Sequence, residues 1–251
     1  MRLNLPGTLF LIALAILWEV TARLSPSPNF PAFSTVVVTL VTNFDVIAFE
    51  TLQTLKRAVI GFLIALATML PLGVFLGRVK AAGDIVEPVI EFIRPLPPIA
   101  MIPVAMIFLG IGDPARIAVV AYGCAFPILI NAMEAVRGAH PMLGNVARSL
   151  RLTSAEQMRL IDLPAALPQI MAGVRISIAT ALLLSVVAEM LLAANGLGTF
   201  IVRAQERFQI AQNLAALLTI VILALIINAL LEGADRKLLA WHHERHAAHH
   251  D

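Results

Sequence analysis

The chain has 251 residues, of which 59% are hydrophobic and only 14% are charged, and its net charge is +2. Soluble domains average about 25% charged residues, and disordered chains are poor in apolar residues. These figures therefore exclude a soluble globular domain and an intrinsically disordered chain. The Lys and Arg residues form no basic stripe, so we expect no nucleic-acid partner. A helical membrane protein remains, because each span needs about 20 mostly apolar residues.

Uncharged stretches predict six transmembrane helices. In chain order they are residues 3–18, 59–76, 95–112, 117–133, 176–202 and 208–231. The third is broken by Pro97, Pro98 and Pro103, and the fifth is interrupted by Glu189. The runs are continuously apolar and do not alternate with period two, which indicates helices rather than barrel strands. We interpret the first stretch as a span and not as a cleaved signal peptide, because no small-x-small cleavage site follows it.

Lys and Arg in short loops predict the orientation, since they gather on the cytoplasmic side. If the N-terminus is inside, the cytoplasmic side receives Arg2, Arg78, Lys80, Arg137, Arg148, Arg151, Arg159, Arg236, Lys237 and Arg245. The other side receives Arg23, Lys56, Arg57, Arg116, Arg203 and Arg207. We therefore expect a multi-pass protein with both termini in the cytoplasm. Between the first two spans, Ser34 is expected to cap a short outer helix that ends near Asn43.

The longest cytoplasmic loop, residues 138–169, is expected to begin a helix near Ser154. Thr153 and Glu156 have the spacing of a capping box, in which each side chain bonds the other residue's backbone N–H. Pro164 and Pro168 should end or bend the chain before the next span.

An apolar side is expected on the second of two short helices in this loop, and it comprises Met158, Ile161 and Leu163. Both helices should lie at the inner membrane surface. Such an apolar side needs either lipid or a protein partner to cover it.

The same loop resembles the cytoplasmic motif of ATP-binding-cassette importer permeases. That motif reads Glu-Ala-Ala, three residues, Gly, nine residues, Ile-x-Leu-Pro. This chain has Asn145-Val146-Ala147, Arg151 and Ile161-x-Leu163-Pro164 at that spacing. Other segments resemble the nitrate, sulfonate and taurine branch of these permeases: residues 94–103, 126–129, 163–168, 173–175, 188–190 and 196–198. The resemblance covers roughly residues 50 to 232.

The resemblance implies an all-α membrane protein with six transmembrane helices and a coupling loop, similar to a type I importer permease. The chain then divides into three regions. Residues 1–50 contain the first transmembrane helix and an outer interfacial segment, residues 51–240 form the transmembrane core, and residues 241–251 form a His-rich cytoplasmic tail. The implied coupling positions are Asn145, Ala147, Arg151, Thr153, Ile161, Leu163 and Pro164.

The implied partners are a cytoplasmic ATPase dimer, a second permease subunit, a substrate-binding protein and the lipid bilayer of the bacterial inner membrane. A homodimer of permeases is favoured, with a heterodimer as the alternative. The implied cargo is a small anion of the sulfonate, taurine or nitrate class, and a thiamine-precursor-like heterocycle is the alternative.

Arg151 departs from the motif, which has glycine there. Glycine after a short helix suits the left-handed conformation, in which another residue costs about 1 kcal/mol or more. Either Arg151 adopts that conformation, or the helix runs on and the turn is remodelled. Asn145 also removes a carboxylate from the motif, so coupling strength and the choice of ATPase are open.

Residues inside the expected spans suggest a translocation pathway or gate: Pro97, Pro98, Met101, Pro103 and Glu189. Prolines free backbone carbonyls, which at membrane depth must face protein or a cavity. A carboxylate in a span is costly unless it is paired or wet. For Glu189 the alternative is a structural hydrogen bond near the outer interface.

Two charged residues near the third span, Glu91 and Arg94, are expected to form an interfacial ion pair, because their i,i+3 spacing brings them onto neighbouring positions of a helix. The alternative for these residues is a role toward the substrate.

No enzymatic chemistry is expected. The chain lacks a Gly-x-x-x-x-Gly-Lys-Ser/Thr phosphate loop, so another chain would have to hydrolyse ATP, and it lacks intramembrane protease motifs. The alternative function is a stand-alone secondary transporter or channel, which inverted repeats or midplane charges would favour.

No cofactor and no metal site are expected. The histidines of residues 242–250 could bind metal adventitiously but are interpreted as a solvated tail. Cys124 is expected to be a small core residue.

Overall fold

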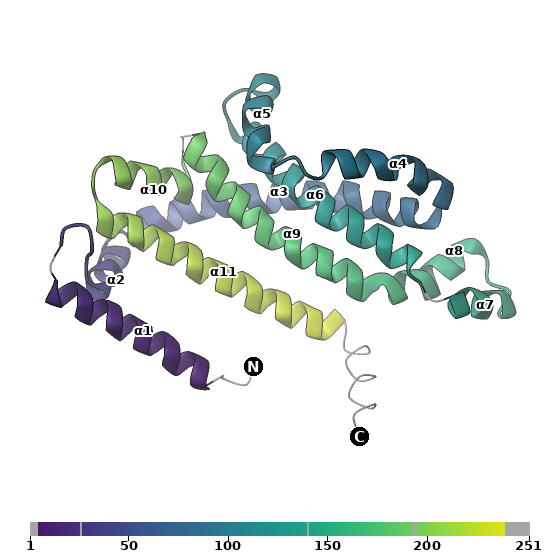
Figure 1. Cartoon of the computed structure of the whole chain (residues 1–251), viewed down its shortest axis with the longest axis horizontal. Coiled ribbons are helices and arrows are strands. Elements are labelled where there is room, and N and C mark those ends of the chain that lie inside the picture. The colour runs from purple at the N-terminus through teal and green to yellow at the C-terminus, as the bar shows by residue number, and fades with distance from the viewer. Residues whose placement is uncertain (1–4, 26, 140, 193–194, 239–251) are drawn as a thin grey trace. The chain divides into compact units, whose positions relative to one another are not determined.

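The computed structural model describes residues 5–25, 27–139, 141–192 and 195–238. This part of the chain is helical (Figure 1). Its elements are α1 (Leu5–Leu24), α2 (Phe33–Thr42), α3 (Phe44–Arg78), α4 (Lys80–Ile93), η1 (Pro98–Met101), α5 (Ile102–Leu109), α6 (Asp113–Arg137), α7 (Pro141–Ser149), α8 (Ser154–Gln157), η2 (Met158–Asp162), α9 (Leu163–Leu191), α10 (Leu197–Glu206) and α11 (Ile210–Leu238).

Five of the described helices are long and apolar enough to cross a membrane, and a sixth crossing is formed if one bent pair counts as a span. The expected spans at 59–76 and 117–133 lie inside α3 and α6. The first and last expected spans likewise fall largely within α1 and α11, although residues 3 and 4 lie outside the described residues. The predicted all-α membrane architecture is therefore confirmed.

The third expected span, residues 95–112, is broken at its prolines as predicted, but its bounds are wrong. Its helical part is the short pair η1 and α5, and the crossing is completed by α4, which meets that pair at an angle of 86°. Pro97 and Pro98 lie at the break, where proline cannot supply the backbone N–H that a continuous helix needs.

The fifth expected span, residues 176–202, is also wrong in its bounds. The helix runs without a break from Ser154 to Leu191, and a separate helix, α10, follows. Pro164 and Pro168 lie within this helix and do not end it. Both prolines lie inside the continuous helix, Pro164 shortly after the π turn η2, and membrane helices accommodate such prolines when neighbours satisfy the freed carbonyls.

The described chain divides into two compact units, each made of separate segments. The first unit contains residues 1–54 and 189–223. Its core packs Val36 of α2 and Ile47 of α3 against Leu197 and Ala215. A hydrogen bond also joins α1 to the segment before α2, because Trp18 Nε1 donates to the Pro31 carbonyl at 3.1 Å.

Ser34 does not cap α2, contrary to expectation. The N-cap is Ala32, which makes no side-chain cap bond. The Ser34 backbone N–H and hydroxyl instead donate to the carboxylate of Glu19 on α1, each at 2.9 Å. The hydroxyl is therefore used to join two helices of the first unit.

The second unit contains residues 55–188 and 224–251, and its long helices α3, α6 and α9 approach closely (Figure 1). A Cβ atom on Gly73 would lie 2.6 Å from the Leu129 carbonyl, and one on Gly173 would lie 2.6 Å from the Pro127 carbonyl. Small residues at such contacts are typical of helix packing in membranes. Cys124 is fully buried in this core, as predicted.

Candidate functional site

The expected cytoplasmic loop folds as α7, a turn, α8 and the single π-helical turn η2. We call residues 141–163 the loop element. Its first short helix, α7, is separate, as predicted. The second helix is wrong as an independent element, because α8 continues through η2 into α9. The α7 helix contacts η2, so the loop element is packed onto the start of a membrane helix.

Arg151 adopts the left-handed conformation, with φ of 52°. Its N–H donates to the Arg148 carbonyl and the N–H of Leu152 donates to the Ala147 carbonyl, both at 3.0 Å. These two bonds form a Schellman motif, which ends a helix with a left-handed residue that is usually glycine. Arg151 therefore adopts the strained left-handed conformation. The alternative, in which the helix runs on and the turn is remodelled, is wrong.

The capping box at the start of α8 is confirmed. Glu156 Oε2 accepts from the Thr153 backbone N–H at 2.8 Å, and Thr153 Oγ1 accepts from the Glu156 N–H at 3.3 Å. The two bonds satisfy donors that a helix N-terminus otherwise leaves unpaired. The turn between α7 and α8 is therefore fixed at both sides.

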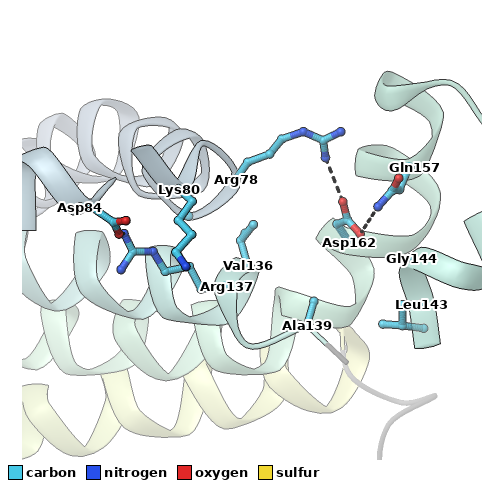
Figure 2. A pocket seen from close by; sticks show the side chains of 11 residues that line it. Arg78, Lys80, Asp84, Val136, Arg137, Ala139, Leu143, Gly144, Gln157 and Asp162 are labelled. Carbon is cyan, nitrogen blue, oxygen red and sulfur yellow. Dashed lines mark hydrogen bonds and ion pairs between the residues drawn. The ribbon is translucent and has the colours of Figure 1, made fainter. Parts of the chain in front are cut away.

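An ion pair connects the loop element to the end of α3 (Figure 2). Arg78 Nη1 donates to Asp162 Oδ2 at 2.9 Å, and Arg78 Nη2 donates to the Ser154 carbonyl at 2.8 Å. The Asp162 residue is buried, and Gln157 Nε2 donates to its other oxygen at 3.4 Å. One guanidinium thus holds both the start of α8 and the π turn.

A cavity of about 630 Å³ lies beside this ion pair, as Figure 2 shows. Its lining residues are Gly77, Arg78, Lys80, Asp84, Val136, Arg137, Ala139, Leu143, Gly144, Gln157 and Asp162. Arg137 also pairs with Glu87 at 2.8 Å and with Asp84 at 3.3 Å. The cavity is therefore walled by α3, α4, α6 and the loop element, and most of its charge is internally paired.

An exposed apolar stripe runs along α7 and was not predicted. Met142, Val146 and Leu150 are 64%, 43% and 63% exposed. Their spacing of four residues puts them on one face of the helix. By contrast, Met158 and Ile161, expected to form the apolar side, are partly covered by the chain itself. The i, i+4, i+8 pattern of α7 was the signal that could have identified the stripe.

The other expected residues of the loop lie around this stripe. Ala147 is buried, with 1% exposure, whereas Leu163 is 40% exposed. Asn145 is exposed and accepts a hydrogen bond from Arg148 Nη2. Ile161 and Pro164 are half-buried.

Glu189 lies in a buried hydrogen-bond network of the first unit, at the N-terminus of α10. Its carboxylate accepts from Thr54 Oγ1 at 2.8 Å and from the Gly198 N–H at 3.2 Å. A second buried carboxylate, Glu50, accepts from the Gly196 N–H. Because a helix N-terminus favours negative charge, this arrangement supports the structural hydrogen bond over a gate.

Gly196 is required for this network. Its φ is +111°, and a Cβ atom at this position would lie 2.2 Å from Glu189 Cδ. A side chain here would be strained and would collide with the carboxylate. The glycine therefore allows the backbone to approach Glu189.

The expected pathway prolines fall in the second unit, where a cavity of about 330 Å³ lies between the α4–η1 break, α6 and α9. Of the four pathway candidates at the break, Pro98 lines this cavity, whereas Pro97, Met101 and Pro103 do not. The expected Glu91–Arg94 ion pair is wrong, since no ion pair within 4.0 Å joins these two described residues.

No group of His, Cys, Asp and Glu side chains among the described residues is arranged to hold a metal ion. The His-rich tail, residues 241–251, lies outside the described residues.

Comparison with known proteins identifies the family. Residues 69–239 match the family described as binding-protein-dependent transport system inner membrane component. The putative aliphatic sulfonates transport permease protein of Bacillus subtilis is 31% identical over 74% of this chain and 67% of its own length. The bicarbonate transport system permease protein of Synechococcus elongatus is 30% identical over 76% of this chain and 69% of its own.

A solved structure has the same fold. The MetNI methionine ABC transporter in an inward-facing conformation gives a TM-score of 0.68 at 22% identity, over 78% of this chain and 98% of that chain. The family match covers well over half of the sequence and falls on the helices and the loop element described above. The chain is therefore a permease of an ATP-binding-cassette importer and belongs to the binding-protein-dependent transport system inner membrane component family.

Proposed function

We propose that this permease couples ATP hydrolysis by a separate ATPase dimer to the import of a small anion, which a substrate-binding protein delivers. The observation that carries the proposal is the apolar stripe of α7, comprising Met142, Val146 and Leu150. The stripe is exposed on an element whose two ends are fixed by the Schellman turn and by the ion pair of Arg78.

The stripe supports docking of a protein partner on energetic grounds. Fully burying one large apolar side chain contributes about 1.5–3 kcal/mol, so covering three of them contributes several kcal/mol. Exposed apolar patches of this kind mark interaction sites. The arginines on the same element, Arg148, Arg151 and Arg159, are exposed and favour a cytoplasmic location.

The loop element is also suited to transmit motion. The helix runs from Ser154 at the loop to Leu191 without a break, so displacement of the docked end would move a whole membrane helix. Arg78 connects that end to α3 as well. In this proposal the ATPase dimer moves the α7 stripe, and α9 and α3 carry the movement to the transport pathway.

The names of the relatives support a small oxyanion as the cargo. One is named for aliphatic sulfonates and the other for bicarbonate, and both cargoes are small oxyanions. We propose an oxyanion of the sulfonate, taurine or nitrate class for this chain. Two copies of the permease form the pathway, and both termini lie in the cytoplasm of the bacterial cell.

The test is reconstitution of the permease with its ATPase and binding protein in liposomes. Val146→Asp should reduce ATPase binding at least about tenfold, because it places a carboxylate in an apolar interface, and a loss of 1.4 kcal/mol is a factor of ten. Uptake should fall with it. Ser154→Asp adds the same charge to the loop element at an exposed residue outside α7 and should retain binding.

Normal ATPase binding by Val146→Asp would contradict docking through the stripe. Transport by the permease in liposomes without any ATPase would instead support the stand-alone transporter and overturn the proposed function.

A further inference from the structure

One cation of the second unit, Arg94, has no partner among the residues that the structure describes. Arg94 follows α4 at its break with η1, and its residue is exposed. Its side chain makes no hydrogen bond or ion pair with any described residue. Other arginines of this unit differ: Arg57 and Arg116 pair with Asp113, and Arg137 pairs with Glu87.

The depth of Arg94 follows from its neighbour Tyr122. The Tyr122 hydroxyl donates to the Ile93 carbonyl at 3.2 Å, so the end of α4 is level with that residue of α6. Tyr122 is about nine residues from the outer end of α6 and about fifteen from the inner end. At 1.5 Å per residue, these distances are about 14 and 22 Å. Arg94 therefore lies near the middle of the bilayer.

A charged side chain at this depth must face water or a counter-ion. Arg94 lines the 330 Å³ cavity together with Pro98, Tyr122 and Asn131. The cationic group also lies at the C-terminal end of α4, where the helix dipole favours positive charge. The guanidinium of Arg94 thus lies beside a cavity in the membrane, and no described carboxylate pairs with it.

The break in the helix strengthens this assignment. Discontinuous membrane helices leave backbone groups free near the midplane, and substrate sites of transporters form there. Among the described residues, no carboxylate lines the cavity or pairs with Arg94, and this includes Glu91 three residues before it.

We propose that this cavity is the anion-binding site of the transport pathway and that Arg94 is its charge-bearing residue, the ligand being a small sulfonate or carboxylate-like oxyanion. The inference rests on the proposed function, because it takes the cargo to be an anion. It adds to the proposed function a location for the bound anion and a residue that binds it. A planar guanidinium can donate hydrogen bonds to two oxygens of one oxyanion.

A cargo-independent experiment tests the charge of the cavity. A single cysteine is introduced by Ile130→Cys in a Cys124→Ala background, since Ile130 lines the cavity and native Cys124 is buried. In membranes of the assembled transporter, the cysteine is treated with negatively charged sulfonatoethyl methanethiosulfonate and with its positively charged trimethylammonium analogue. The measured quantity is the modification rate with the negative reagent divided by the rate with the positive reagent.

The negative reagent should react faster, and Arg94→Gln should lower the ratio at least about tenfold, because a unit charge a few ångströms away acts oppositely on the two reagents. Arg94→Lys should keep the ratio high. Lys56→Gln, which removes an exposed cation of α3 that lines no described cavity, should not change it. A ratio unaffected by Arg94→Gln, or a cysteine that reacts with neither reagent, would overturn the proposal.

A transport measurement separates this inference from the proposed function. The complete transporter in liposomes is offered labelled ethanesulfonate, taurine, nitrate and bicarbonate. For the anion that the unmodified permease imports, Arg94→Gln should lower uptake at least about tenfold while ATPase binding is retained. Equal uptake by Arg94→Gln would overturn the anion site and leave the proposed function standing. Failure of the unmodified complex to import any anion would overturn the proposed function itself.

Discussion

Arg151 and Phe208 are the two non-glycine residues with positive φ in the described ranges, at 52° and 55°. Each ends a short helix with the same pair of backbone hydrogen bonds. In both places a side chain is kept at a position that glycine would occupy without strain. Both residues are exposed, so their side chains are presented to the surroundings at sites where the backbone geometry is fixed.

Replacing Arg151 by glycine should therefore stabilise the permease. Removing the left-handed strain should raise the free energy of unfolding by about 1 kcal/mol, which corresponds to an increase in Tm of about 2–4 °C for a chain of this size. Thermal unfolding of the purified protein measures it. Arg151→Ala removes the same charge but keeps the strain, so its Tm should not rise.

An equal increase for both Arg151 variants would show that charge, not backbone strain, sets the effect. The same variants also address function, since Arg151 lies on the loop element. If Arg151→Gly is stable but no longer supports uptake, the guanidinium makes a contact with the partner that glycine cannot make.

At the scale of elements, the most informative feature is the continuous helix from Ser154 to Leu191. Its first turns are held by Arg78 of α3, which bonds both Asp162 and the Ser154 carbonyl. Asp162 is buried, so its carboxylate depends on this partner more than a surface carboxylate would. The contact connects two membrane helices at the loop element.

Removing the ion pair should loosen this connection. Arg78→Gln and Asp162→Asn should each lower the free energy of unfolding by about 1–3 kcal/mol, the cost of leaving a buried polar group poorly paired. The double variant should lose less than the sum, because the second change removes a partner that is already gone. Unfolding of all four proteins measures the coupling energy.

Strict additivity in that cycle would contradict a direct interaction between Arg78 and Asp162. A useful control is Glu19→Gln combined with Arg23→Gln, a pair on α1 that is more exposed. Its coupling energy should be below about 1 kcal/mol, as is typical of surface ion pairs.

Elements defined by local chemistry could be predicted from the sequence. The capping box at Thr153 depends on residues three positions apart, and it was predicted correctly. The end of α9 could not be predicted in the same way. The search for uncharged stretches continued the expected span through Gly196, because glycine carries no charge. The break there depends on carboxylates that bond the backbone of this segment, Glu189 from nine positions away and Glu50 from 146 positions away.

The candidate site shows the same limit. The motif spacing placed Arg151 and the loop correctly, but the exposed stripe of α7 required knowledge of which residues the chain itself covers. For Arg94, the i,i+3 spacing with Glu91 suggested a pair. The bend after α4 and the cavity beside it are long-range features, and they leave the guanidinium without that partner.

At the scale of the whole molecule, composition and topology decide which side of the membrane each segment occupies. Five described helices cross by length and composition, and the bent pair of α4 with η1 and α5 either crosses as a sixth span or re-enters on one side. Six crossings put the two ends of the chain on the same side. A re-entrant pair would reverse every segment after it, including the loop element.

We predict that the bent pair crosses, because only then do the loop element and the basic C-terminal end lie in the cytoplasm together with the N-terminus. Single cysteines introduced by Ser149→Cys on α7 and by Ile111→Cys after α5 test this in a Cys124→Ala background. A membrane-impermeant maleimide should label the Ser149→Cys variant in inside-out vesicles and the Ile111→Cys variant in right-side-out vesicles. The reverse labelling of the α7 variant would indicate a re-entrant pair, and would also remove the α7 stripe from the side on which ATP is hydrolysed.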